Sequence, residues 1–454
     1  MVEAMRESQI NWTNPSVTAF AAGSDPVESV LEAARELVFD ARERGWGGPP
    51  FDPFKLADLR RIRVVPVDEV GEARLVHREG RPRIEFNPNR PPARVRFSVA
   101  HELAHLLFPD AADRVRERVH GPRARPDDWQ IELLCNLAAA ELLMPTGSFP
   151  EVAAEELDIN ELMSQRSEFQ VSPESALLRV VRLTSLPAAV LAAARVRRDT
   201  PSYRVDYVIG SRAWTPRLER GDVFDDELLA QCTAIGYTAK GEIVTSSARL
   251  SAQCVGVPPY PGDSYPRVIG IVRPETAIAV ASEPLYVHGD AAEPRGDGPK
   301  IIAHVVNDKT VNWGGHGFAP HLRSRYPEAQ EDVRAWVAGA SGLKLGGTRL
   351  TEVRPGVFVC TMVAQRGYGG DTPKIPLRYG ALDRCLAALG QHARAHEASI
   401  HMPMIGAGQA GGDWGVIKEM IAARLLPEAT SVLIYILPGA PLPDAQEAQL
   451  ALRV

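Results

Sequence analysis

The order of expected helices and strands changes along this chain, and these changes constrain its fold more than any other feature. Helices with a few short strands come first, a region of short strands follows, and strands alternating with helices come last. Such alternation is typical of an α/β domain whose sheet is covered by helices on both faces. Since 454 residues also exceed the length of one ordinary domain, we expect a multidomain protein of α+β and α/β class.

The first part of the chain is expected to combine helices with a small number of strands. Its apolar residues are spaced accordingly, with helices at 26–44 and 129–144 and strands at 63–67 and 83–86. Two short helices follow between residues 159 and 183. Ser172 is placed to cap the second of them, and Pro173 suits a first helical turn.

The rest of the chain divides into a β-rich region and an alternating region. Runs rich in β-branched residues, such as 203–209 and 268–272, predict a β-rich middle domain of unknown role. The alternating part has strands at 301–306, 357–363, 399–402 and 431–437, and helices at 328–337, 381–396 and 416–426. We therefore expect domains at residues 1–158, 159–185, 186–284 and 285–440, with a tail at 441–454.

Composition narrows the classes of protein to consider. The formal net charge of -6 argues against a protein whose main task is to coat nucleic acid. The five cysteines are scattered without zinc-knuckle spacing, which suggests reduced thiols. The first residues lack the apolar core of a signal peptide, and no stretch reaches the roughly 18 apolar residues of a membrane helix. We expect a cytoplasmic protein that does not enter a membrane.

Two histidines in an expected helix, His101 and His105, are spaced to share a metal ion. Residues four apart project from one face of a helix, and Glu102 then lies beside the ion. Zinc lowers the pKa of a water molecule to about 7, and a carboxylate can accept its proton as the water attacks a peptide carbonyl. Apolar residues continue the helix at 106–108, which argues against a solvated face. The pattern predicts a peptidase site with one zinc ion and Glu102 as catalytic base.

A third metal ligand is needed, because a catalytic zinc ion usually has three protein ligands and one open position. Glu132, near the start of the next expected helix, is our candidate. Spacing alone does not rank it above four other acidic residues, which are Asp110, Asp127, Asp128 and Glu141.

Several of these stretches, taken together, resemble the ImmA/IrrE family of metallopeptidases. The matching stretches are 86–88, 94–107, 132–136 and 140–145, and the resemblance covers roughly residues 26–185. It implies a zincin-like domain in which Glu132 completes the zinc site and Glu102 is catalytic. Members typically cleave helix-turn-helix repressors under a stress or prophage signal. Residues 159–185 resemble the helix-turn-helix-like segment of the family, and the middle domain would correspond to its variable regulatory region.

Two glycine-rich loops follow strands of the last expected domain, at residues 313–319 and 402–412. The backbone N–H groups of such loops can approach phosphate oxygens closely, helped by the dipole of a following helix. One such loop is more often a plain turn, but two in one α/β domain indicate a site for a diphosphate.

With residues 286–290 and 301–308, these loops resemble a macro domain, a three-layer α/β fold that binds ADP-ribose or related nucleotides. The likeness covers about residues 285–437. It implies that Asp290, next to Ala291, meets the adenine amino group and that Asn307 lies near the distal ribose. The residues implied to hold the diphosphate are Gly314, Gly315, Gly317 and Phe318 in the first loop, and Ile405, Gly406, Ala407, Gly408, Gln409 and Ala410 in the second.

The second loop departs from the macro domains that remove ADP-ribose from acidic side chains. In those domains the loop reads Gly-Leu-Asp and the Asp takes part in the chemistry, whereas this chain has Gly408-Gln409-Ala410. Asp413 follows three positions later, and we interpret it as a helix cap. We therefore expect this domain to bind its ligand without hydrolysing it.

The sequence predicts a zinc endopeptidase governed by an ADP-ribose-type nucleotide, with a helix-turn-helix repressor or another intracellular protein as substrate. A role in stress response or phage defence would suit this layout. One alternative is an ADP-ribosyl glycohydrolase that acts through the macro-like domain. A third hypothesis is a transcription regulator, although the candidate recognition helix from Pro173 to Leu183 has only Arg179 and Arg182 as basic residues.

Overall fold

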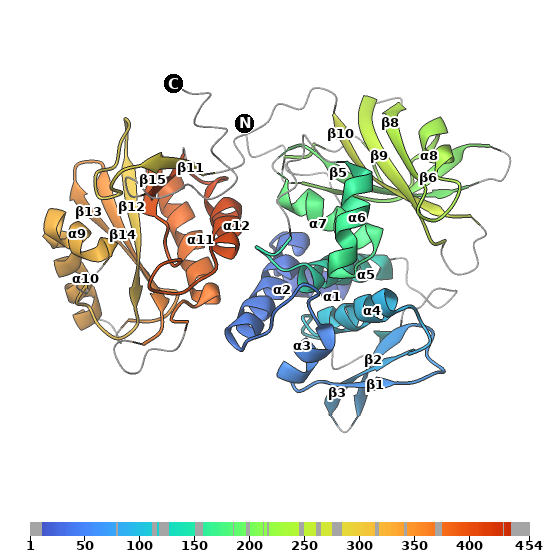
Figure 1. The fold of residues 1–454 in the computed structure, drawn as a ribbon, viewed down its shortest axis with the longest axis horizontal. Helices are drawn as coiled ribbons and strands as arrows, with labels where there is room; N and C mark the ends of the chain where they lie inside the picture. Colours follow the sequence, from blue (N-terminus) through green and yellow to red (C-terminus); the bar gives the residue numbers. More distant parts are fainter. Residues whose placement is uncertain are drawn as a thin grey trace. The chain divides into compact units, whose positions relative to one another are not determined.

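The computed structural model shows helices and three sheets arranged in two compact units (Figure 1). Unit 1 comprises residues 1–145 and 149–280, and unit 2 comprises residues 146–148 and 281–454. The structure describes residues 11–78, 80–110, 116–117, 127–149, 158–184, 186–196, 200–211, 213–215, 218–244, 249–259, 265–274, 284–313, 317–339, 343–367, 375–429 and 431–436. The expected class, multidomain with mixed α and β structure, is confirmed. The expected boundaries inside the units stay predictions, and the tail at 441–454 lies outside the described residues.

Unit 1 begins with helices around a small sheet of order β1-β3-β2-β4. The elements are α1 (Pro15–Ala21), α2 (Pro26–Glu43), α3 (Pro53–Leu59), β1 (Arg63–Pro66), β2 (Ala73–Arg78), β3 (Arg81–Phe86), α4 (Pro92–His105), β4 (Arg116–Glu117), α5 (Asp128–Leu143), α6 (Ile159–Phe169) and α7 (Pro173–Leu183). The sequence analysis did not predict strand β2, because Arg74, His77 and Arg78 interrupt its apolar residues. Its antiparallel pairing with β3 holds it in the sheet.

Helix α5 lies at the centre of the helical part of unit 1. Its apolar residues surround the helix instead of forming one stripe, which is typical of a core helix. It packs against α1, α2, α4 and α7. A buried polar side chain on α5 therefore needs a hydrogen-bond partner, which Gln130 finds in the segment before α1.

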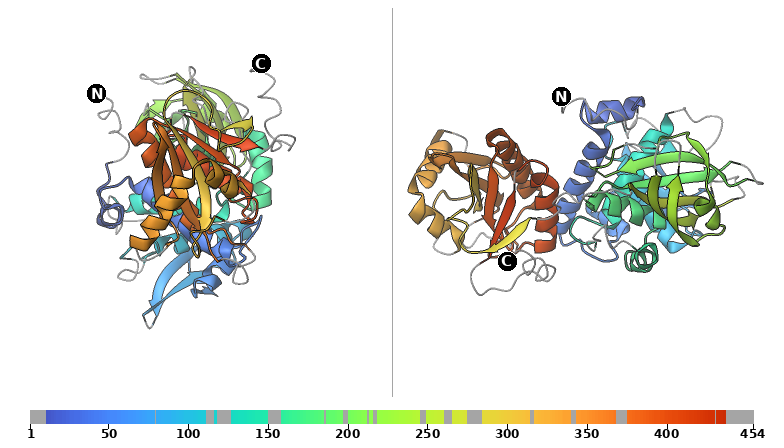
Figure 2. Two further views of the ribbon diagram at one scale, coloured as in Figure 1. Left: turned by 90° about the vertical axis from the view of Figure 1, so that its left-hand side faces the viewer. Right: turned by 90° about the horizontal axis from the view of Figure 1, so that it is seen from above.

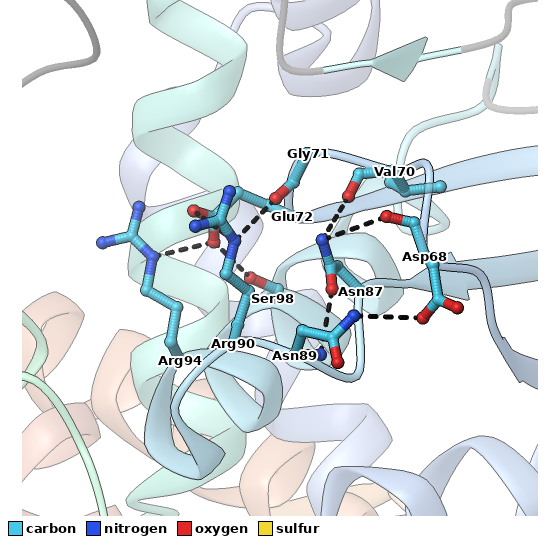
Figure 3. Close-up of polar contacts among 9 residues, drawn as sticks. All are labelled: Asp68, Val70, Gly71, Glu72, Asn87, Asn89, Arg90, Arg94 and Ser98. Atoms are coloured by element: carbon cyan, nitrogen blue, oxygen red, sulfur yellow. Dashed lines mark hydrogen bonds and ion pairs between the residues drawn. The ribbon is translucent and has the colours of Figure 1, made fainter.

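Polar contacts tie the first half of α4 to the loop between β1 and β2 (Figure 3). Glu72 accepts a hydrogen bond from Arg94 Nε at 2.7 Å and one from Ser98 Oγ at 3.4 Å. The loop that leads into α4 is held as well, because Asn87 Nδ2 donates to the carbonyl of Val70 at 2.8 Å. These contacts set the position of the helix that carries both histidines.

The middle of the chain forms a six-stranded antiparallel sheet of order β7-β6-β5-β10-β9-β8. Its elements are β5 (Ala189–Arg195), β6 (Ser202–Gly210), β7 (Val223–Asp225), α8 (Glu227–Gln231), β8 (Thr238–Val244), β9 (Arg249–Val257) and β10 (Arg267–Pro274). Helix α7 packs on this sheet, as Figures 1 and 2 show. Glu174 of α7 accepts a hydrogen bond from Tyr207 of β6 at 2.5 Å and pairs with Arg267 of β10 at 3.1 Å.

The two helices expected between residues 159 and 183 are present, and Ser172 caps α7 by accepting a hydrogen bond from Ser175 N at 3.1 Å. Both arginines of α7 lie in ion pairs inside unit 1. Arg179 contacts Glu141 of α5 at 2.5 Å, and Arg182 pairs with Glu28 of α2. Helix α7 therefore uses its arginines to hold neighbouring helices and does not present them as a recognition helix would.

Unit 2 contains a six-stranded sheet of order β11-β16-β15-β12-β14-β13, parallel except for β13. Its elements are β11 (Leu285–His288), β12 (Lys300–Asn307), α9 (Phe318–Arg325), α10 (Pro327–Gly339), β13 (Thr348–Arg354), β14 (Val357–Gln365), α11 (Tyr379–His396), β15 (Ser399–Pro403), α12 (Trp414–Leu425) and β16 (Val432–Ile436). Alternate residues of β12 and β14 pack against α9 and α10 on one face. Helices α11 and α12 lie on the other face (Figure 1). Among the described residues, no helix is long and apolar enough to cross a membrane.

Two buried histidines stand inside the sheet of unit 2. His401 contacts Ser399 Oγ through Nε2 at 2.9 Å and the Tyr435 hydroxyl through Nδ1 at 3.0 Å. Burial and, less strongly, the charge of Lys300 lower its pKa to about 4. His304 contacts Thr361 Oγ1 at 2.8 Å, and burial lowers its pKa to about 3. Both imidazoles are therefore neutral in the folded protein near pH 7.

We predict that unit 2 loses stability as the pH falls from about 6.5 toward 4. In this range both histidines become protonated in the unfolded chain, whereas His401 and His304 stay neutral in the folded protein because their pKa values are lowered. Each histidine contributes up to about 1.4 kcal/mol per pH unit in this window. Urea unfolding of the full chain at several pH values measures the slope. His401→Gln should reduce that slope, whereas His288→Gln, at an exposed position, should leave it unchanged. Equal slopes in all three proteins would contradict the assignment.

Candidate metal centre

The two histidines lie on the buried last turns of α4. His101 is 0% exposed and His105 is 2% exposed, because residues 98–105 of this helix are covered by the rest of unit 1. Their ring centroids are 4.9 Å apart and the ring planes are nearly perpendicular. The expected helical spacing therefore does bring both imidazoles to one side of α4.

Glu132 of α5 meets both imidazoles. One carboxylate oxygen lies 3.1 Å from His101 Nε2, and the other lies 3.5 Å from His105 Nε2. The side chain of Glu132 is 31% exposed, so the open side of the group faces solvent while the histidines are covered. The three predicted ligands thus converge from two helices on one small volume.

The opposite ring nitrogens are held by two further residues of α5. His101 Nδ1 donates to Asn136 Oδ1 at 2.9 Å, and His105 Nδ1 lies 3.3 Å from Cys135 Sγ. Contacts of this kind fix the orientation and tautomer of imidazoles that bind a metal through Nε2. Sequence reasoning missed both residues. The available signal was that Asn136 follows Glu132 by four positions and therefore faces the same way as Glu132.

The competing acidic residues have other partners or positions. Asp110 accepts a hydrogen bond from Ser16, and Asp127 lies 3.5 Å from Thr13 Oγ1. Glu141 is the buried partner of Arg179, and Asp128 begins α5 one turn before Glu132. Glu132 contacts both histidines through its two carboxylate oxygens.

Cys135 offers a second donor set, since donor atoms of His101, His105 and Cys135 lie within 4.8 Å of one another. However, Cys135 contacts Nδ1 of His105, whereas Glu132 faces Nε2 of both rings. One imidazole cannot direct both nitrogens at the same ion. We therefore favour Glu132 as the third donor, with Cys135 orienting His105.

This donor set suits zinc. Two imidazoles and one carboxylate, with a side open to solvent, match the composition and openness of catalytic zinc sites. Glu102, the expected base, follows His101 directly on α4 and is 1% exposed. A carboxylate in such a covered position can act in proton transfer.

The expected nucleotide residues of unit 2 follow the carboxyl ends of parallel strands. Asp290 comes after β11, Asn307 ends β12, and residues 405–410 come after β15. Because these strands run parallel, their carboxyl ends share one edge of the sheet, which is the usual ligand-binding edge of an α/β domain. The structure thus brings these residues to the same edge.

The polar side chains at this edge help to shape their own loops. Asp290 Oδ1 accepts from Ala292 N at 2.8 Å, and its other oxygen lies 3.6 Å from His321 Nδ1. Asn307 Oδ1 accepts from Lys309 N and Thr310 N at 2.8 and 2.9 Å. Both side chains are therefore held in place by hydrogen bonds to nearby backbone N–H groups.

The glycine-rich loops are only partly described. Gly314 and Gly315 lie outside the described residues, while Gly317 and Phe318 begin α9. In the second loop, Gly406 has a φ of +74° that favours glycine. Its neighbours Ile405 and Ala410 are buried, Ala407 is half-buried, and Gly408 and Gln409 are exposed. Asp413 caps α12 as interpreted, accepting from Gly415 N at 2.9 Å.

Part of unit 1 is similar to a known protein family. Residues 59–181 match the model of peptidase family M78, described as the IrrE N-terminal-like domain. The match includes α4 and α5 with the histidines and Glu132. This part of the chain is therefore similar to metallopeptidases.

Other similar proteins correspond to about a third of the chain. The chromodomain-helicase-DNA-binding protein 1-like of Danio rerio is 29% identical over 160 residues, which are 33% of this chain and 15% of that protein. The chain thus spans a small part of this relative. A macrodomain protein from Streptomyces coelicolor is 35% identical, covering 34% of this chain and 99% of that one, with a TM-score of 0.30. A Bacteroides thetaiotaomicron protein of unknown function is 33% identical, covering 35% of this chain and 99% of that one, with a TM-score of 0.32.

We predict that Asn136→Ala weakens zinc binding about 10- to 100-fold, because His101 loses the acceptor that orients its ring. Competition with a chromophoric chelator measures the affinity. Asn160→Ala, an exposed asparagine on α6, is the matched control and should leave the affinity unchanged. A folded Asn136→Ala protein with unaltered affinity would refute the role of Asn136.

Cys135→Ala separates the two donor sets. If Cys135 only orients His105, the variant should retain one zinc ion per chain with at most about 100-fold weaker affinity. Loss of the ion from Cys135→Ala, together with retention in Glu132→Gln, would instead make the thiol the third ligand.

Proposed function

We propose that unit 1 is a zinc-dependent endopeptidase whose metal is held by His101, His105 and Glu132. The observation that carries this proposal is the convergence of two buried Nε2 atoms on the two oxygens of Glu132, at 3.1 and 3.5 Å. The match of residues 59–181 to a peptidase family supports it. We further propose a cytoplasmic substrate, a helix-turn-helix repressor or another intracellular protein, and a role in stress response or phage defence.

The side chains have separate roles in this proposal. A zinc ion bound here would act as a Lewis acid toward the scissile carbonyl and would activate water. His101 and His105 hold fixed orientations through Asn136 and Cys135. Glu102 removes a proton from the attacking water and can return it to the departing amine.

We expect Glu102→Gln to abolish cleavage of a susceptible protein while zinc remains bound, because the variant lacks the base and keeps the three metal ligands. His101→Ala should lose both zinc and cleavage. Metal analysis and a cleavage assay on candidate repressors test both statements. His77→Gln, on β2 outside the site, serves as the matched control and should retain both properties. Wild-type cleavage by Glu102→Gln would exclude this mechanism.

For unit 2 we propose binding of ADP-ribose or a related nucleotide, which would govern the activity or the targeting of the peptidase. Asp290 would meet the adenine amino group and Asn307 the distal ribose, with the two glycine-rich loops at the diphosphate. Support comes from the position of Asp290, Asn307 and residues 405–410 at one edge of a parallel sheet. The alternative, ADP-ribosyl glycohydrolase activity, lacks an aspartate in the second loop, where Gln409 is exposed and Asp413 serves as a helix cap.

We predict that Asp290→Ala weakens ADP-ribose binding about tenfold or more, since the adenine amino group loses its charged acceptor. Isothermal titration of the full chain measures the affinity. Asp297→Ala, at an exposed position near β12, is the control and should bind as the wild type does. Release of ADP-ribose from a modified protein that survives Glu102→Gln and is lost in Asn307→Ala would favour the glycohydrolase alternative.

A further inference from the structure

The antiparallel sheet of unit 1 ends in a strand whose outer side is exposed at its centre. Strand β8 pairs with β9 on one side (Figure 1), and among the described residues no other strand pairs with its outer side. Residues 240–242 are exposed. Because Gly241 has no side chain, its exposed surface is backbone. We call Thr238–Val244 the β8 edge.

The ladder between β8 and β9 shows which backbone groups face away from the sheet. Gly256 N donates to the Tyr237 carbonyl at 2.8 Å, and Thr238 is the residue opposite Val255. Opposite residues of an antiparallel ladder alternate between bonded and non-bonded pairs, so Thr238 belongs to a non-bonded pair. The same alternation turns outward the backbone N–H and C=O groups of every second residue, which are residues 238, 240, 242 and 244. Such a row of backbone groups can receive another strand.

Large apolar side chains are exposed at both ends of the β8 edge. Val244 at one end is 54% exposed, and Tyr237 and Ile235, just before the other end, are 59% and 61% exposed. In the described part of the chain, seven large apolar side chains are exposed, and three of them are these. Their concentration on one strand marks the β8 edge as an interaction surface.

The sequence of the β8 edge indicates which partner it fits. Lys240 and Glu242 flank Gly241 and point to the same face of the sheet. When two copies of this strand pair antiparallel about Gly241, Lys240 of each copy lies opposite Glu242 of the other. Thr238 lies opposite Val244 in the same arrangement. Opposite charges across a ladder stabilise it, whereas a shift that places Lys240 opposite Lys240 is destabilising. The β8 edge is therefore complementary to a second copy of itself.

The contacts that Lys240 and Glu242 make within the chain are compatible with this pairing. Lys240 pairs with Asp158 just before α6, and Glu242 Oε2 lies 2.7 Å from Arg249 Nη1 of β9. The side chains of these four residues are 42% to 56% exposed. Ion pairs at such exposed positions contribute little to stability. Both charges can therefore contact a second copy without leaving a buried charge unpaired.

We propose that the β8 edge is the interface of a homodimer, in which two copies pair antiparallel about Gly241 and join their six-stranded sheets. The outward backbone groups of Lys240 and Glu242 then face those of the other copy, and glycine at the centre permits a close approach of the two strands. A lysine on an edge strand usually discourages pairing, but here each lysine meets a glutamate. The interface uses no residue of the metal centre or of the proposed nucleotide site, so it does not depend on either assignment.

Sedimentation equilibrium of the zinc-loaded full chain over a wide range of concentrations tests the interface. We expect a reversible monomer–dimer equilibrium for the wild type. Lys240→Glu and Glu242→Lys each place like charges opposite each other at two points of the two-fold ladder, so each should raise the dimer dissociation constant about tenfold or more. Asp158→Asn removes the charge that pairs with Lys240 and leaves β8 intact, so this control should dimerise as the wild type does.

Charge exchange tests the register itself. The double variant Lys240→Glu/Glu242→Lys should dimerise as the wild type does, because both opposite-charge pairs are restored. An equal mixture of the two single variants should form a heterodimer, since their facing positions then carry opposite charges. Circular dichroism verifies that each variant is folded. Three results would overturn the proposal: a wild type that is monomeric at every concentration, unchanged dimerisation of either folded single variant, or no heterodimer in the mixture.

Discussion

The structure of unit 1 depends on the burial of helix α5. This helix is covered on nearly every side, yet it carries Glu132, Asn136 and Glu141. Polar groups in a core are costly unless they are paired, so the buried Glu141 must find a partner, whereas Glu132 and Asn136 are half-buried. Glu132 and Asn136 meet the histidines of α4, and Glu141 meets Arg179 of α7. The candidate metal centre is thus part of the set of contacts that gives the polar side chains of α5 their partners.

The same contacts show that helix α7 has a structural role. Breaking a buried ion pair such as Arg179–Glu141 leaves an uncompensated charge and costs about 3–5 kcal/mol. Helix α7 also holds the middle sheet, through Glu174 with Tyr207 and Arg267. Helix α7 therefore joins the metal-bearing helices to the β-rich region.

Unit 2 is organised around a sheet that is mostly parallel, and not around a buried helix. Its sheet is parallel apart from one edge strand, so chain segments that are far apart in sequence reach one edge together. The buried histidines His304 and His401 stay neutral within the sheet, while the groups proposed to meet a ligand lie in loops beyond the strand ends. Stability and ligand recognition thus rest on different residues.

The sequence by itself determined the features that depend on neighbours a few positions apart. These are the shared face of His101 and His105, the cap at Ser172 and the strand–helix alternation of unit 2. The choice of Glu132 among five acids came from a family resemblance and not from spacing, because the packing of α5 on α4 decides which carboxylate meets the imidazoles. The contacts of Asn136 and Cys135 with the histidines also appeared only in the tertiary structure. The spacing of apolar and polar residues over a few positions determines local structure, whereas the packing of helices and sheets determines which distant segments come into contact.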